Sequence, residues 1–303
     1  MVIRKMIHMQ KFLCFKAMRA GLAIAAVLFS AGCVSRPLSS GVQPFGVIGA
    51  DSDIYVFAPV TGNEQLLKAL FAAFVPEKTA NRYLSRTSII YAGIRYNTEP
   101  SMIVVSLGSY PAGAAGLLFS KKDGWEKRRS SDGGTITYYR SAAADVAFGS
   151  SGAAYALFGG SGRNTVAFLR RITEPQQPSF PPRFDALQAH NGAGEAHAEI
   201  GVYIRSAQRI TAELAGLEGI ELPVRSIEFY LRKDAGTTYR YSAVFETVNA
   251  RTAGALRLWI GSMLSGTLSI DGSSLVVKDA GITEERLIDL FRSFHLNANA
   301  KDR

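Results

Sequence analysis

Histidine and glutamate side chains gather in one short polar stretch, and these residue types could bind a metal ion. The residues are His190, Glu195, His197 and Glu199. If the stretch forms a strand, His197 and Glu199 share one face, where a zinc site would still need a further strong ligand. A hydrophilic connection between two elements accounts for the same residues more simply. We therefore expect no metal site here.

Sequence signatures of enzymes are absent from the chain. The sequence contains no GxSxG, HExxH or SxxK motif, no P-loop and no GxGxxG. The segment FGGSGRN at 158–164 shares only its glycines with phosphate-binding loops, because no Lys-Ser or Lys-Thr pair follows it. We expect a strand-to-helix turn there, no cofactor and no enzymatic activity.

Cys33 is the residue at which we expect covalent chemistry, because it directly follows a short apolar run. Residues 21–32, GLAIAAVLFSAG, carry no charge, and five basic but no acidic residues precede them. A basic segment followed by a short apolar one is typical of an export signal. The run is too short for a transmembrane helix, which needs about 20 apolar residues. We predict a signal peptide at residues 1–32 that is removed.

The residues before Cys33 resemble the box of bacterial lipoprotein precursors, in which small residues precede a cysteine that receives diacylglycerol. Here Ser30, Ala31 and Gly32 precede the cysteine, and Ser30 replaces the usual leucine, as in the relaxed boxes of spirochaetal lipoproteins. The resemblance implies that Cys33 carries acyl chains such as palmitate, and two or more chains anchor a protein stably. The alternative is an ordinary secreted protein with a chance cysteine.

The export signal also changes what the cysteine count and the charge mean. Cys14 lies in the predicted signal peptide, so an acylated mature chain would have no thiol for a cysteine protease, a thiol oxidoreductase or a cysteine-ligated zinc site. From Cys33 onward there are 29 basic and 25 acidic residues, a net charge of +4 instead of +9. This mild charge gives no support for nucleic-acid binding. The basic segment KKDGWEKRR at 121–129 is expected to be a solvated turn, and a patch for lipid headgroups or an anionic polymer is the alternative.

Composition divides the mature chain into a tether, two units and a linker. Residues 33–50 are rich in Ser, Gly and Pro and predict a lipidated tether. Four prolines between 175 and 182 predict a Pro-rich linker at 174–196, which separates residues 51–173 from residues 197–303. Period-two patterns such as SIEFYLRK at 226–233, mixed with helical segments, predict the α+β class with antiparallel sheets covered by apolar helices.

The two units show a similar order of predicted elements. In both, a strand precedes a helix, two strands, a second helix and further strands, and Ile54, Ile89 and Ala112 correspond to Ile200, Ile227 and Ala253. The offsets between the matched residues are similar, which favours two related α+β units in tandem. Chance similarity between two α+β segments is the alternative.

Several predicted helices lack the polar face of a surface helix, in segments 66–75, 112–120 and 252–264. One interpretation is that neighbouring structure buries both faces of these helices. The other is that they contact lipid or enter the membrane interface near the anchor. The candidate lipid-contacting residues are Leu66, Leu67, Leu70, Phe71, Phe74, Leu117, Leu118, Phe119, Leu256, Trp259, Ile260 and Met263.

An anchored chain with the SAGC box and an α+β body with apolar helices resembles a treponemal outer-membrane lipoprotein family. Members of that family lie on the periplasmic leaflet and insert amphipathic helices. The resemblance implies lipid binding, an open and a closed state, and altered membrane permeability. We therefore expect a non-enzymatic, lipid-anchored outer-membrane protein on the periplasmic leaflet, with membrane lipids as its partners. A periplasmic scaffold or assembly factor that binds another envelope protein is the alternative, and an enzyme of the envelope polymer comes third.

Overall fold

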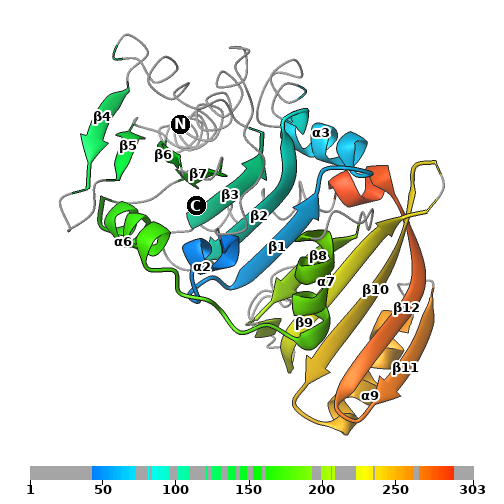
Figure 1. Ribbon diagram of the computed structural model, residues 1–303. Helices are drawn as coiled ribbons and strands as arrows, with labels where there is room; N and C mark the ends of the chain where they lie inside the picture. The colour runs from blue at the N-terminus through cyan, green and yellow to red at the C-terminus, as the bar shows by residue number, and fades with distance from the viewer. Residues whose placement is uncertain are drawn as a thin grey trace, which may run out of the picture. The chain divides into compact units, whose positions relative to one another are not determined.

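Antiparallel strands and several helices form the fold, which confirms the α+β class predicted from the sequence (Figure 1). The computed structural model describes residues 43–72, 81, 84–95, 101–109, 121, 125–130, 136–140, 144–148, 153–158, 162–192, 199–205, 207–208, 223–234, 236–261 and 266–289. The chain divides into two compact units. Unit 1 comprises Met1–Asp51, Glu64–Ser179 and Lys301–Arg303, and unit 2 comprises Ser52–Asn63 and Phe180–Ala300.

The sheet of unit 1 is antiparallel at every neighbouring pair. Its strand order is β2 (Thr87–Arg95), β3 (Ser101–Gly108), β7 (Ala153–Phe158), β6 (Ala144–Phe148), β5 (Thr137–Arg140) and β4 (Glu126–Arg129). Helix α6 (Gly162–Thr173) packs Phe168 edge-on against Tyr155 of β7, with ring centroids 6.5 Å apart. Helix α3 (Glu64–Ala72) belongs to the same unit and buries Leu66 and Leu67.

Part of the predicted tether at 33–50 is folded, which corrects that prediction. Residues Pro44–Ile48 form the short helix α2, which contacts β2, β3 and α6. Its apolar side chains Phe45, Val47 and Ile48 are buried, which explains why this segment folds onto the unit. Arg171 of α6 fixes its end by donating from Nη1 to the carbonyl of Ile48 at 2.6 Å.

The sheet of unit 2 is also antiparallel. Its order is β11 (Thr267–Asp271), β12 (Ser274–Thr283), β10 (Thr238–Thr247), β9 (Val224–Lys233), β8 (Ile200–Ile204) and β1 (Ile54–Pro59). The turn between β11 and β12 holds Gly272 at a φ of 57°, a conformation that glycine adopts without steric cost and that the Asp-Gly pair predicts. Helix α9 (Ala250–Gly261) lies against β10, β11 and β12 (Figure 1).

Two predicted boundaries differ from the structure. Strand β1 lies in the predicted first unit, 51–173, but it belongs to unit 2 because it pairs with β8, with Ile54 opposite Ile204. The predicted linker at 174–196 contains helix α7 (Pro182–Gly192). Proline restricts only positions beyond the first turn of a helix, and Pro182 starts this helix. Phe184 and Leu187 anchor α7, and they pack closely over Gly201, where a Cβ would lie 2.8 Å from Leu187.

The two units share a strand order. In unit 1, β2 and β3 are followed along the sheet by β7 and then β6, and in unit 2, β9 and β10 are followed by β12 and then β11. In unit 1, the second strand of the β6–β7 hairpin pairs with β3. In unit 2, the second strand of the β11–β12 hairpin pairs with β10. Four strands of each unit thus follow the same order, and the origin of the two units by duplication stays a prediction. The β4–β5 hairpin extends unit 1 beyond this pattern and has no counterpart among the strands described for unit 2.

Candidate functional site

Large exposed apolar side chains are concentrated in one segment of unit 2. Among the described residues they are Val248, Leu258, Trp259 and Ile270, with exposed fractions of 37%, 80%, 40% and 39%. Single exposed apolar residues are common on protein surfaces, but several within one short segment mark an interaction site. The segment runs from Val248, just before α9, to Ile270 of β11, so this part of unit 2 is the candidate site.

Helix α9 exposes apolar residues because its opposite face is buried against the sheet, which sets the orientation of the helix about its axis. Asn249 caps the helix, and its Oδ1 accepts a hydrogen bond of 2.9 Å from the backbone N–H of Thr252. Ala253, Leu256 and Ile260 recur at helical spacing and are buried. Leu258 lies about 200° around the helix from Leu256, so it lies outside the buried face of the helix. An amphipathic surface helix would carry a polar residue at that position.

An open groove runs between α9 and β11. It has a volume of about 910 Å³ and is lined by Gly254, Arg257, Leu258, Gly261, Gly266, Leu268 and Ile270. The two elements approach closely at Gly261, where a Cβ would lie 3.1 Å from Cδ1 of Leu268. We use the name α9–β11 surface for this groove together with Trp259.

The charge of α9 is entirely positive. The helix carries Arg251 and Arg257, both exposed, and contains no acidic residue. Exposed arginine and lysine side chains near an apolar surface attract the anionic headgroups of a membrane. The α9–β11 surface therefore combines exposed apolar side chains, a tryptophan and cationic groups, which is the chemistry of an interfacial membrane contact.

Glu246 of β10 holds the β11–β12 turn in place. Its carboxylate accepts hydrogen bonds of 2.9 Å from the Ser273 hydroxyl and 2.5 Å from the Ser274 hydroxyl. These bonds favour the ionised form and lower the pKa of Glu246 below its usual value. Because β11 forms one wall of the groove, the turn contributes to the shape of the site.

Replacing Glu246 with glutamine is expected to remove a pH-dependent contribution to stability. The folded-state pKa lies below the unfolded one, so this contribution is fully present above the usual value of 4.5 and is lost as the pH falls through the folded-state value. The melting temperatures of wild type and Glu246→Gln should differ at neutral pH and converge on acidification. Thermal melts followed by circular dichroism check this, and a difference that does not change with pH would contradict it.

The structure exposes one predicted lipid-contacting residue and buries four. Trp259 is exposed, whereas Leu66, Leu67, Leu256 and Ile260 have exposed fractions of 1%, 5%, 7% and 3%. These four side chains face the protein interior, as the alternative interpretation of core helices requires. The other predicted positions lie outside the residues, or the side chains, that the structure describes: Cys33, Leu70, Phe71, Phe74, Leu117, Leu118, Phe119 and Met263.

The candidate residues predicted from the sequence did not include Leu258, although it lies in the apolar segment 252–264, and they did not include Ile270. Both are exposed and both line the groove. The signal that could have found Leu258 is Asn249, because this cap sets the helix start and thereby the inward register of Ala253 and Leu256. Nothing comparable identifies Ile270, whose exposure depends on β11 being at the end of the sheet of unit 2.

The polar stretch considered for metal binding is described only in part. Glu199 forms an ion pair with Arg183 of α7 at 3.2 Å. The side chains of His190, Glu195 and His197 lie outside the described part of the chain. Among the side chains that are described, no group of three or more His, Cys, Asp and Glu residues could hold a metal ion. In the same part of the chain, no helix has both the length and the apolar character needed to cross a bilayer.

Comparisons with known proteins point to one family. The model of the family described as outer membrane-associated lipoprotein TP0453 matches residues 39–288. The outer membrane protein TP0453 of Treponema pallidum (strain Nichols) is 28% identical over 255 residues, which cover 84% of this chain and 86% of that protein. Crystal form III of TP0453 superposes with a TM-score of 0.72 at 26% identity, over 84% of this chain and 100% of the solved one. Crystal form I gives a TM-score of 0.69 at 26% identity, over 84% and 98%.

Proposed function

We propose that this chain, which belongs to the TP0453 family of outer membrane-associated lipoproteins, inserts its α9–β11 surface into the leaflet to which Cys33 anchors it. In this proposal the acyl chains on Cys33 hold the protein on the periplasmic leaflet of the outer membrane. The α9–β11 surface then enters the interface between headgroups and acyl chains. The chain performs no catalytic step, and its partners are membrane lipids.

The exposure of Leu258 is the observation that carries the proposal. Its side chain is 80% exposed, whereas Ala253, Leu256 and Ile260 of the same helix are buried. Transfer of such a side chain out of water stabilises the inserted state by about 1.5–3 kcal/mol. Trp259 beside it belongs to the residue type that is enriched at membrane interfaces.

Helix α9 suits a position in the plane of the interface. Its 12 residues span about 18 Å, which is less than the about 30 Å of a hydrocarbon core. An anchor on Cys33 raises the effective concentration of the surface at the membrane, so a modest apolar area is sufficient. Insertion of the α9–β11 surface into a single leaflet would expand that leaflet. We propose that this expansion alters the permeability of the outer membrane.

The proposal is tested with the chain that lacks residues 1–33 and therefore has no anchor. We expect this chain to float with phospholipid vesicles at physiological salt and to gain protection from proteases at residues 252–264. Segment 65–75, where Leu66 and Leu67 are buried, serves as the internal comparison and should change less. If the chain stays at the bottom of the gradient, the proposal is wrong.

A further inference from the structure

The β4–β5 hairpin is an addition to the repeated strand pattern, and it ends the sheet of unit 1 with a charged strand. All four residues of β4, Glu126–Arg129, are exposed, and among the described strands β4 pairs only with β5. The sequence predicted a solvated turn for residues 121–129. The side chains of 126–129 are indeed solvated, but the backbone is an edge strand.

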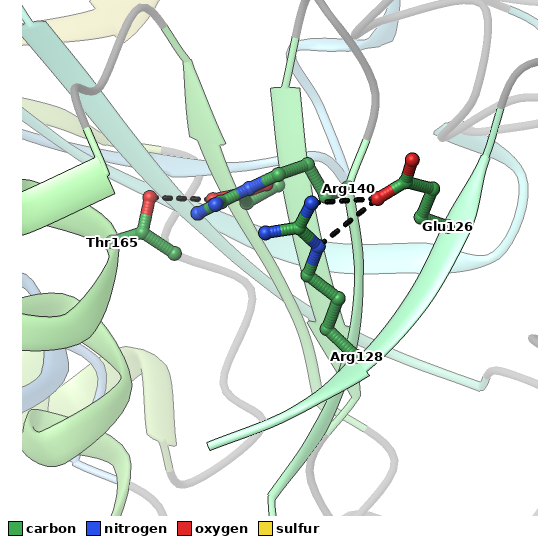
Figure 2. Close-up of polar contacts among 5 residues, drawn as sticks. Glu126, Arg128, Arg140 and Thr165 are labelled. Atoms are coloured by element: carbon green, nitrogen blue, oxygen red, sulfur yellow. Dashed lines mark hydrogen bonds and ion pairs between the residues drawn. The ribbon is translucent and has the colours of Figure 1, made fainter. Parts of the chain in front are cut away.

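A partly buried polar network attaches this hairpin to the body of unit 1 (Figure 2). Arg140 of β5 forms two hydrogen bonds with the carboxylate of Asp145 of β6, at 2.8 and 2.7 Å. Thr165 of α6 donates a further bond of 2.5 Å to Asp145, which is 7% exposed. The hairpin is therefore held in a defined position and presents a preformed edge.

The backbone of β4 offers hydrogen-bonding groups on its outer side. The N–H of Ser130 donates to the carbonyl of Ile136 at 3.0 Å, so these two residues form a hydrogen-bonded pair. Hydrogen-bonded pairs alternate along antiparallel strands, so Arg128 and Glu126 also direct their N–H and C=O groups toward β5. Lys127 and Arg129 consequently direct theirs to the opposite side of β4, where no described strand pairs with it. We call this side the open edge.

The two faces of β4 differ in charge balance. On the face shared with Arg140, Arg128 pairs with Glu126 at 2.6 Å, and this contact lowers the pKa of the Glu126 carboxyl (Figure 2). On the opposite face, Lys127 and Arg129 are exposed, and β4 has no acidic residue there. Two positive charges about 7 Å apart therefore follow the open edge.

We propose that the edge of β4 binds an extended acidic segment of another protein by strand addition. The added strand would form backbone hydrogen bonds with Lys127 and Arg129, and acidic side chains at every second position would lie beside their cationic groups. A segment with carboxylates at alternate positions has the same spacing, about 7 Å, as the two cations. The partner is thus an acidic strand, and it contacts unit 1, whereas the α9–β11 surface belongs to unit 2.

The test measures binding of a fluorescent peptide of alternating glutamate and valine to the full chain in detergent. Lys127→Gln removes one charge and should weaken binding about 3-fold, whereas Lys127→Pro also removes the outward N–H and should weaken it about 10-fold or more. Proline is tolerated where an edge strand's N–H faces solvent, so both variants should keep the wild-type circular dichroism spectrum.

Charge reversal provides the second arm of the test. The double variant Lys127→Glu, Arg129→Glu should lose the glutamate peptide and bind the corresponding lysine peptide. The matched control, Arg251→Glu with Arg257→Glu on α9, should leave peptide binding unchanged. Equal effects of Lys127→Gln and Lys127→Pro would overturn strand addition. If the wild-type chain does not bind the peptide, and the double variant Lys127→Glu, Arg129→Glu loses binding to anionic vesicles, the proposed protein partner is wrong and β4 contacts lipid.

Discussion

Replacing Leu258 with glutamate is expected to lower the affinity of the chain lacking residues 1–33 for phospholipid vesicles by about 30-fold. Leu258 is the most exposed large apolar side chain among the described residues, at 80%. The variant loses about 2 kcal/mol of apolar transfer free energy, which corresponds to that factor. Stability should change little, because Leu258 does not contribute to the core. Binding is measured by flotation over a range of lipid concentrations.

Ala255→Glu is the matched control for this variant. Ala255 is exposed on the same helix, so the substitution introduces the same charge but removes no large apolar group. We expect a clearly smaller loss of affinity than for Leu258→Glu. Equal losses would show that charge alone governs the contact, and they would contradict insertion of Leu258.

Replacing Arg140 with alanine is expected to destabilise the chain by about 3–5 kcal/mol, because it leaves a buried carboxylate without its partner. The side chain of Asp145 is 8% exposed, and Arg140 supplies two of its hydrogen bonds. Among the described side chains, the Thr165 hydroxyl would still donate a hydrogen bond to this carboxylate, but it carries no positive charge. Urea unfolding of wild type and variant gives the difference in the free energy of unfolding.

The neighbouring ion pair on the same hairpin provides the comparison. The side chains of Arg128 and Glu126 are 44% and 64% exposed, and solvent screens such pairs. Arg128→Ala should therefore destabilise the chain far less than Arg140→Ala. A similar cost for Arg128→Ala and Arg140→Ala would contradict the assignment of the Asp145 network as the attachment of the hairpin.

Short-range patterns in the sequence identified the family and several elements. The SAGC box and the apolar helices led to the treponemal outer-membrane lipoproteins, and the comparisons confirm that family. The strand at 226–233 and the helix at 252–264 were predictable because period-two and apolar patterns are local.

Features that depend on distant contacts were not predictable. Strand β1 belongs to unit 2 because Ile54 pairs with Ile204, and no local pattern reports a pairing across that separation. The segment that forms helix α2 was predicted to be part of the tether. Its few apolar residues are buried only through contacts with β2, β3 and α6, which are distant in the sequence. For α9, composition showed an apolar helix, but the sheet beneath it decides that Leu256 is buried and Leu258 is exposed.

Quenching of Trp259 fluorescence by lipids brominated in their acyl chains tests the insertion of the α9–β11 surface most directly. The chain contains one further tryptophan, Trp125, which is 5% exposed and should be quenched little. We predict that vesicles of brominated lipid reduce and blue-shift the emission of the chain lacking residues 1–33, and that Trp259→Phe abolishes this response. Emission that is the same with and without vesicles, or quenching that persists in Trp259→Phe, would contradict the account.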